Sequence, residues 1–132
     1  MFSPDGKWVA FRSDESGRPE LYVAAFPRPA GTFPLSTDGG RFPRWSRDGR
    51  EVFFENRSAR ELLSVAVSTG PEGIRIGQPR RLFGYFNDGG RKHWDVSPDG
   101  QRFLVELEDL ENATADVSPI TLVVNWAAGL RK

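Results

Sequence analysis

The stretch Ser3-Pro4-Asp5-Gly6 decides the fold, because the chain repeats it. It returns as Ser46-Arg47-Asp48-Gly49 and again as Ser97-Pro98-Asp99-Gly100. Serine at the first position, proline at the second and glycine at the fourth are favoured in type I β-turns, which also tolerate the arginine of the middle copy. A turn that recurs along the chain predicts a protein built from copies of one unit.

A short apolar run follows each turn after one or two polar residues. These runs lie within residues 7–11, 50–54 and 101–105. They are too continuous for a half-exposed strand and too short for a helix. Each run therefore predicts a strand that is covered on both faces.

Two further elements complete each unit. A second apolar run occupies residues 20–26, 61–67 and 120–124, and a weaker, proline-containing element follows at 32–35 and 79–83. Proline cannot donate to a strand ladder, so the weaker element belongs at a sheet edge. With an inner strand before the turn, one unit is a four-stranded antiparallel meander. A helix from Ser58, where residues 58–61 have capping-box spacing, is the rival interpretation, but the internal repeat favours a strand.

Composition sets broad limits on function. The 132 residues suit one domain, and the 14 glycines and 10 prolines are typical of many short strands joined by turns. The 18 basic residues are balanced by 18 acidic ones, so no excess charge supports nucleic-acid binding. There is no cysteine to form a disulfide. No apolar stretch approaches the roughly 20 residues of a membrane-spanning helix.

The units resemble the WD-like β-propeller repeat of the TolB type, whose signature is an aromatic residue, Ser-Pro-Asp-Gly, a polar residue and a short apolar run. The three copies begin at Phe2, Trp45 and Val96. The ending, Pro119 to Trp126, resembles the closing segment of bacterial propellers, some of which are attached to kinase or DNA-binding domains.

This resemblance implies an all-β chain that forms a partial β-propeller of about three four-stranded antiparallel blades. We expect a single domain over residues 1–132, with blades near 1–37, 38–87 and 88–127, the first and last being incomplete. The chain then corresponds to the C-terminal three-blade portion of a longer propeller, or two copies close a six-bladed ring. The resemblance also suggests a periplasmic or extracytoplasmic location.

The sequence predicts no catalytic, metal or cofactor site. The single histidine, His93, lies in Arg91-Lys92-His93-Trp94, and its possible role is a ligand contact at the propeller mouth. Basic residues also lead into the turns at Arg41 and Arg44. These residues define a candidate interaction rim for an acidic partner: Arg41, Arg44, Arg91, Lys92, His93 and Trp94.

The leading functional hypothesis is a non-catalytic interaction module that binds another protein, with the missing blades supplied by the same chain or by a second copy. The alternative is the gating propeller of a prolyl-oligopeptidase-type serine peptidase that lacks its catalytic domain. A third possibility is carbohydrate or small-molecule binding at the central channel. Because an open propeller exposes apolar blade faces, we expect the isolated chain to self-associate.

Overall fold

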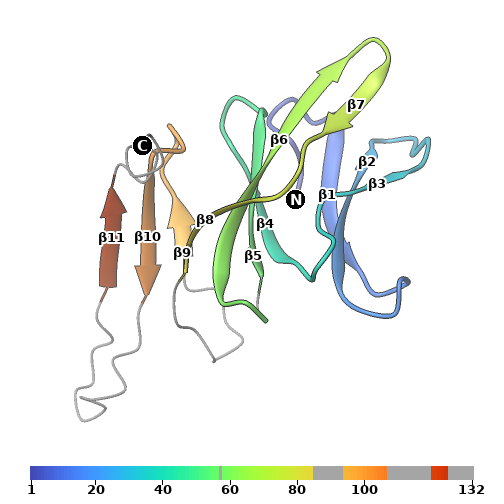
Figure 1. Ribbon diagram of the computed structural model, residues 1–132. Coiled ribbons are helices and arrows are strands. Elements are labelled where there is room, and N and C mark those ends of the chain that lie inside the picture. Colours follow the sequence, from blue (N-terminus) through green and yellow to red (C-terminus); the bar gives the residue numbers. More distant parts are fainter. Residues whose placement is uncertain (57, 85–93, 107–119, 125–132) are drawn as a thin grey trace.

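The regular structure consists of β-strands. The computed structural model describes residues 1–56, 58–84, 94–106 and 120–124, and these ranges contain eleven strands and no helix. The strands form three antiparallel sheets that lie side by side in chain order, which confirms the predicted all-β partial propeller (Figure 1).

We call the three sheets blades 1, 2 and 3. Blade 1 has the strand order β1 (Trp8–Ser13), β2 (Glu20–Ala25) and β3 (Thr32–Pro34). Blade 2 contains β4 (Arg41–Trp45), β5 (Glu51–Asn56), β6 (Glu61–Gly70), β7 (Gly73–Ile76) and β8 (Arg80–Gly84). Blade 3 contains β9 (Trp94–Val96), β10 (Arg102–Glu106) and β11 (Ile120–Val124). The exact limits of the blades stay a prediction.

The middle blade differs from the predicted four-stranded unit. Its third strand, β6, runs to Gly70, and its far end forms a hairpin with β7 in which Gly70 lies opposite Gly73. The near end of β6 pairs with the proline-preceded edge strand β8. Sequence reasoning ended this strand at Val67 because the residues that follow are polar. β6 is a strand from Glu61, so the rival helical interpretation is wrong.

Blade 1 has only the beginning of an inner strand. Phe2 forms an isolated bridge with Val9, and the backbone of Met1 pairs with that of Ala10. In blades 2 and 3 the inner position is filled by β4 and β9. The expected incompleteness of the last blade after residue 124 lies outside the described residues.

The three repeated turns have the same hydrogen bonds. In the middle copy the Gly49 N–H donates to the Ser46 carbonyl at 3.0 Å, which closes the turn. The Ser46 hydroxyl donates to Asp48 Oδ1 at 2.7 Å and accepts from the Glu51 N–H at 2.9 Å. Asp48 Oδ1 also accepts from the Arg50 N–H at 3.0 Å. The glycine has a φ of 72°, which favours glycine over residues with a side chain.

Two apolar layers join the blades. Ala10, Leu21 and Val23 of blade 1 pack with Val52 and Phe54 of blade 2. Successive side chains of a strand point to opposite faces, so Phe53 points the other way. It contacts Phe103 of blade 3 with the ring centroids 5.3 Å apart and the rings edge to face. The facing sheets of blades 1 and 2, and those of blades 2 and 3, are thus buried against each other.

We expect Asp48→Ala to lower the free energy of unfolding at pH 7 by about 1 kcal/mol, the usual net value of a lost hydrogen-bonding group. Hydrogen bonds from the Ser46 hydroxyl and the Arg50 N–H hold the pKa of Asp48 below its ordinary value. The ionised carboxylate therefore stabilises the folded chain above that ordinary value, and its contribution is lost as the pH falls through the lowered pKa.

Urea denaturation at pH 7 and at pH 2 to 3 measures the effect. The difference between wild type and Asp48→Ala should shrink at low pH. Asp14→Ala is the matched control, because Asp14 is exposed and none of the side-chain hydrogen bonds of the repeated turns involves it. An equal loss of stability in both variants would contradict this role of the turn carboxylate.

Candidate interaction site

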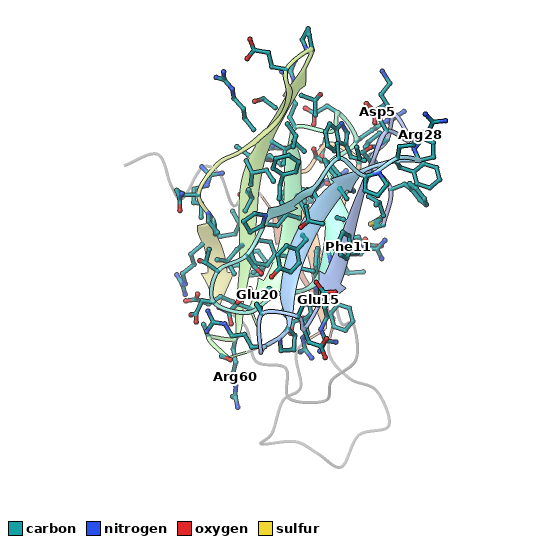
Figure 2. The ribbon with its side chains drawn as sticks, turned by 90° about the vertical axis from the view of Figure 1, so that its right-hand side faces the viewer. Asp5, Phe11, Glu15, Glu20, Arg28 and Arg60 are labelled. Carbon is teal, nitrogen blue, oxygen red and sulfur yellow. The ribbon has the colours of Figure 1, made fainter. Side chains whose placement is uncertain are left out.

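The outer face of blade 1 carries an aromatic surface. Val9, Phe11 and Tyr22 alternate along β1 and β2 with the side chains that face blade 2, so they point away from the rest of the structure. Figure 2 shows Phe11 on this side of blade 1. Phe2 and Phe26 extend the same face and are 52% and 50% exposed. We call these five residues the aromatic face.

The rings of the aromatic face contact one another, and no strand in the described ranges packs over them. Phe2 and Phe26 are edge to face with centroids 4.9 Å apart, and Phe11 and Tyr22 are 6.1 Å apart. The equivalent faces of blades 2 and 3 are buried in the two interblade layers. Sequence reasoning expected an exposed apolar blade face, and the structure identifies the residues that form it.

The structure describes three of the six residues of the predicted interaction rim, namely Arg41, Arg44 and Trp94. Arg44 lies on the inner strand β4, is partly exposed, and has its Nε 4.0 Å from Asp95 Oδ1. Trp94 is only 3% exposed and packs between blades 2 and 3, so it contributes no exposed surface to a rim. Arg91, Lys92 and His93 lie outside the described residues, and their role stays a prediction.

Arg41, the remaining rim residue, is in a buried ion pair. Its Nε donates to Glu55 Oε1 at 2.7 Å, and its Nη2 also contacts that oxygen. Only 11% of the Arg41 side chain and 2% of the Glu55 side chain are exposed. The guanidinium also lies 5.1 Å from the ring centroid of Phe42, which has a positive φ of 53°. Arg41 therefore holds the inner strand against β5, and its charge is compensated within blade 2.

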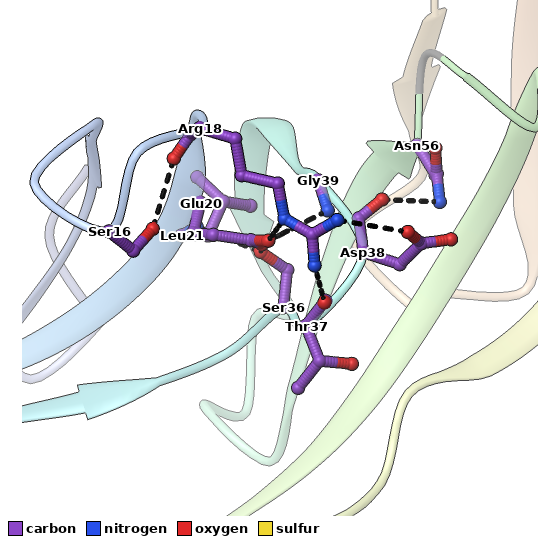
Figure 3. A network of polar contacts seen from close by, with 9 residues as sticks. All are labelled: Ser16, Arg18, Glu20, Leu21, Ser36, Thr37, Asp38, Gly39 and Asn56. Carbon is purple, nitrogen blue, oxygen red and sulfur yellow. Dashed lines mark hydrogen bonds and ion pairs between the residues drawn. The ribbon is translucent and has the colours of Figure 1, made fainter.

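A polar network joins blade 1 to the segment that enters blade 2 (Figure 3). Glu20, at the start of β2, is 5% exposed. Its carboxylate accepts from Arg18 Nε at 2.7 Å, from the Gly39 N–H at 3.0 Å and from the Ser36 hydroxyl. Buried carboxylates need such partners. The network fixes the chain just before β4, and sequence reasoning missed it because its residues are scattered along the chain.

Blade 2 also forms hydrogen bonds to the segment that precedes β4. Asn56, at the end of β5, donates through Nδ2 to the Asp38 carbonyl at 3.0 Å and accepts from the Ala59 N–H at 3.1 Å. Arg18, which precedes β2 in blade 1, contacts the Thr37 carbonyl and the Asp38 carboxylate of this segment. Beside this segment lies a pocket of about 240 Å³ between blades 1 and 2. Arg12, Gly39, Arg41 and Asn56 are among its lining residues.

The described residues contain no group of three or more histidine, cysteine, aspartate or glutamate side chains placed to hold a metal ion. Within the same ranges, no helix has the length and apolar character needed to cross a membrane.

We expect Arg41→Met to lower the free energy of unfolding by about 3–5 kcal/mol, because it leaves the buried carboxylate of Glu55 without its counterion. The double variant Arg41→Met/Glu55→Met should recover most of that loss, since it removes both charges. Urea denaturation of the single and double variants measures both effects. A single variant as stable as the wild type would contradict the structural role of the pair. Arg41 would then again be a candidate residue of the interaction rim.

Comparison with known proteins supports the fold. No family model matches the chain, and no curated protein matches it. Among solved structures, TolB from Acinetobacter baumannii matches 94% of the chain with a TM-score of 0.65 and 19% identity. A protein assigned as TolB from Agrobacterium tumefaciens matches 95% of the chain with a TM-score of 0.59 and 18% identity.

An oligogalacturonate lyase from Vibrio parahaemolyticus is also similar, with a TM-score of 0.60 and 21% identity over 80% of the chain. The chain spans 28% of the Acinetobacter TolB, 44% of the Agrobacterium protein and 27% of the lyase. The fold of this chain is therefore that of a part of a TolB-like β-propeller.

Proposed function

We propose that this chain is a non-catalytic interaction module that binds another protein through the exposed surfaces of its propeller blades. The aromatic face carries this proposal. Soluble proteins rarely expose a large contiguous apolar patch unless it serves an interface, and aromatic residues are enriched in protein interfaces. The equivalent positions in blades 2 and 3 pack against another sheet, which supports a packing role for this surface as well.

A second candidate function is enzymatic. The likeness to an oligogalacturonate lyase favours this alternative, in which the chain is part of an enzyme for acidic oligosaccharides. Exposed and partly exposed arginines such as Arg12 and Arg44 suit carboxylate-bearing sugars. Incubation of the chain with oligogalacturonate tests it directly. Turnover by the chain alone would reject the non-catalytic proposal.

Site-specific cross-linking tests the interaction role. A photoreactive phenylalanine analogue at the position of Phe26, in the full chain expressed in its native cells, should give a discrete cross-linked protein after irradiation. The same analogue at the position of Gln101 is the control, since this residue is exposed in the turn before β10 of blade 3, and blade 2 lies between blade 3 and blade 1 (Figure 1). Mass spectrometry identifies the product.

A cross-linked species specific to the Phe26 position is the expected result. Equal labelling at both positions, or none at either, would contradict binding through the aromatic face. A product that contains only this chain would show that a second copy covers the face.

A further inference from the structure

The outer edge of β7 has backbone groups that no strand in the described ranges pairs with. The Gly77 N–H donates to the Ala66 carbonyl at 2.8 Å, which shows which residues of this segment face β6. Edge groups alternate along an antiparallel strand, so the N–H and carbonyl groups of Ile74 and Ile76 point away from β6. The hairpin projects beyond the sheet, and this edge therefore lies outside the stacked part of blade 2 (Figure 1).

This edge lacks the features that block the other outer edges of blades 1 and 2. β3 contains Pro34, and β8 follows Pro79 and has a register shift in its pairing with β6. Prolines, bulges and charges are the usual protection of an edge against added strands. β7 contains no proline and pairs with β6 through four residues without a shift. Its one charged residue is Arg75, and such a charge can select one partner as well as exclude others.

The two faces of β7 differ in chemistry. Ile74 and Ile76 face blade 1 and pack in the apolar layer with Trp8. Arg75 alternates with them and points to the opposite face, where 84% of its side chain is exposed. In the described ranges Arg75 forms an ion pair with Glu72 at 3.5 Å, and the Glu72 side chain is 87% exposed. Exposed pairs of this kind contribute little, so the charge of Arg75 is only weakly compensated.

The space beside β7 can take the side chains of an added strand. A hollow of about 430 Å³ borders the hairpin, and its lining includes Ser68, Ile74 and Arg75. Opposite charges on neighbouring strands attract each other, so the residue opposite Arg75 should carry a carboxylate. The residues opposite Ile74 and Ile76 lie on the apolar face and should be apolar.

We propose that the outer edge of β7 binds an extended segment of a partner protein as an added antiparallel strand, with the pattern apolar, acidic, apolar. The backbones of Ile74 and Ile76 supply donors and acceptors to this segment, and the guanidinium of Arg75 selects the acidic side chain between them. In strand addition of this kind, main-chain hydrogen bonds provide affinity and side-chain contacts provide specificity.

This site rests on the proposed interaction role and deepens it by naming the chemistry of one partner segment. Blade 2 lies between blades 1 and 3, so the position of the edge follows from strands that the structure describes. The edge belongs to blade 2, whereas the aromatic face belongs to blade 1, and the two surfaces can therefore be tested separately.

A titration of the isotope-labelled chain by nuclear magnetic resonance tests the proposal. The probes are acetylated and amidated peptides of sequence Thr-Val-Glu-Val-Thr, with lysine in place of glutamate as the matched comparison. The glutamate peptide should shift the amide signals of Ile74 and Ile76 saturably and bind about two- to fivefold more tightly than the lysine peptide, as expected for an opposite-charge cross-strand pair. Arg75→Glu should reverse this order.

Arg60→Glu is the control variant. It makes the same charge change at an exposed arginine just before β6, at the end of that strand opposite to the hairpin (Figure 2), and should leave the preference for the glutamate peptide unchanged. A glutamate peptide with proline in place of both valines lacks the backbone donors that face Ile74 and Ile76, so it should lose binding.

Equal affinity for the glutamate and lysine peptides would overturn the carboxylate assignment. A shift of the Ile74 and Ile76 signals with chain concentration alone would also overturn the proposal, because a second copy would then occupy the edge. If no peptide shifts these signals while cross-linking at Phe26 captures a partner, the edge site is wrong and the interaction role stands.

Discussion

The contact between a serine hydroxyl and an aspartate carboxylate inside each repeated turn sets the geometry on which the rest of the structure depends. In the middle copy the Ser46 hydroxyl donates to Asp48 and accepts from the backbone of Glu51. The Ser46 N–H also donates to the Glu51 carbonyl at 2.8 Å, the first rung between inner and buried strand. The turn therefore determines which residues of the two strands lie opposite each other.

Strand register matters here because β5 is covered on both faces. Phe54 packs toward blade 1 and Phe53 toward blade 3, so the two neighbouring residues serve two different apolar layers. A shift of one residue would exchange these faces and place Glu55 in the layer with blade 1. The repeated turn thus links a local hydrogen-bond pattern to the stacking of whole blades.

The sequence was sufficient for the turns and most strands because these depend on neighbours in the chain. The repeated turn predicted the pairing of inner and buried strand in blades 2 and 3, and proline marked edge strands such as β8. The length of β6 could not be predicted, since its far end has polar residues and is stabilised by β7. Arg41 was assigned to an exposed rim because its partner Glu55 is recognised only when the register between β4 and β5 is known.

The division of β6 between two partners has a consequence for how this chain can change. Its near end belongs to the blade through β8, whereas its far end pairs with β7 in a hairpin that projects beyond the sheet (Figure 1). The tip, residues 70–73, takes no part in either apolar layer. Exposed tips of this kind tolerate added sequence. The hairpin is thus the natural place for a tag, a label or an evolutionary insertion that leaves the stacked sheets intact.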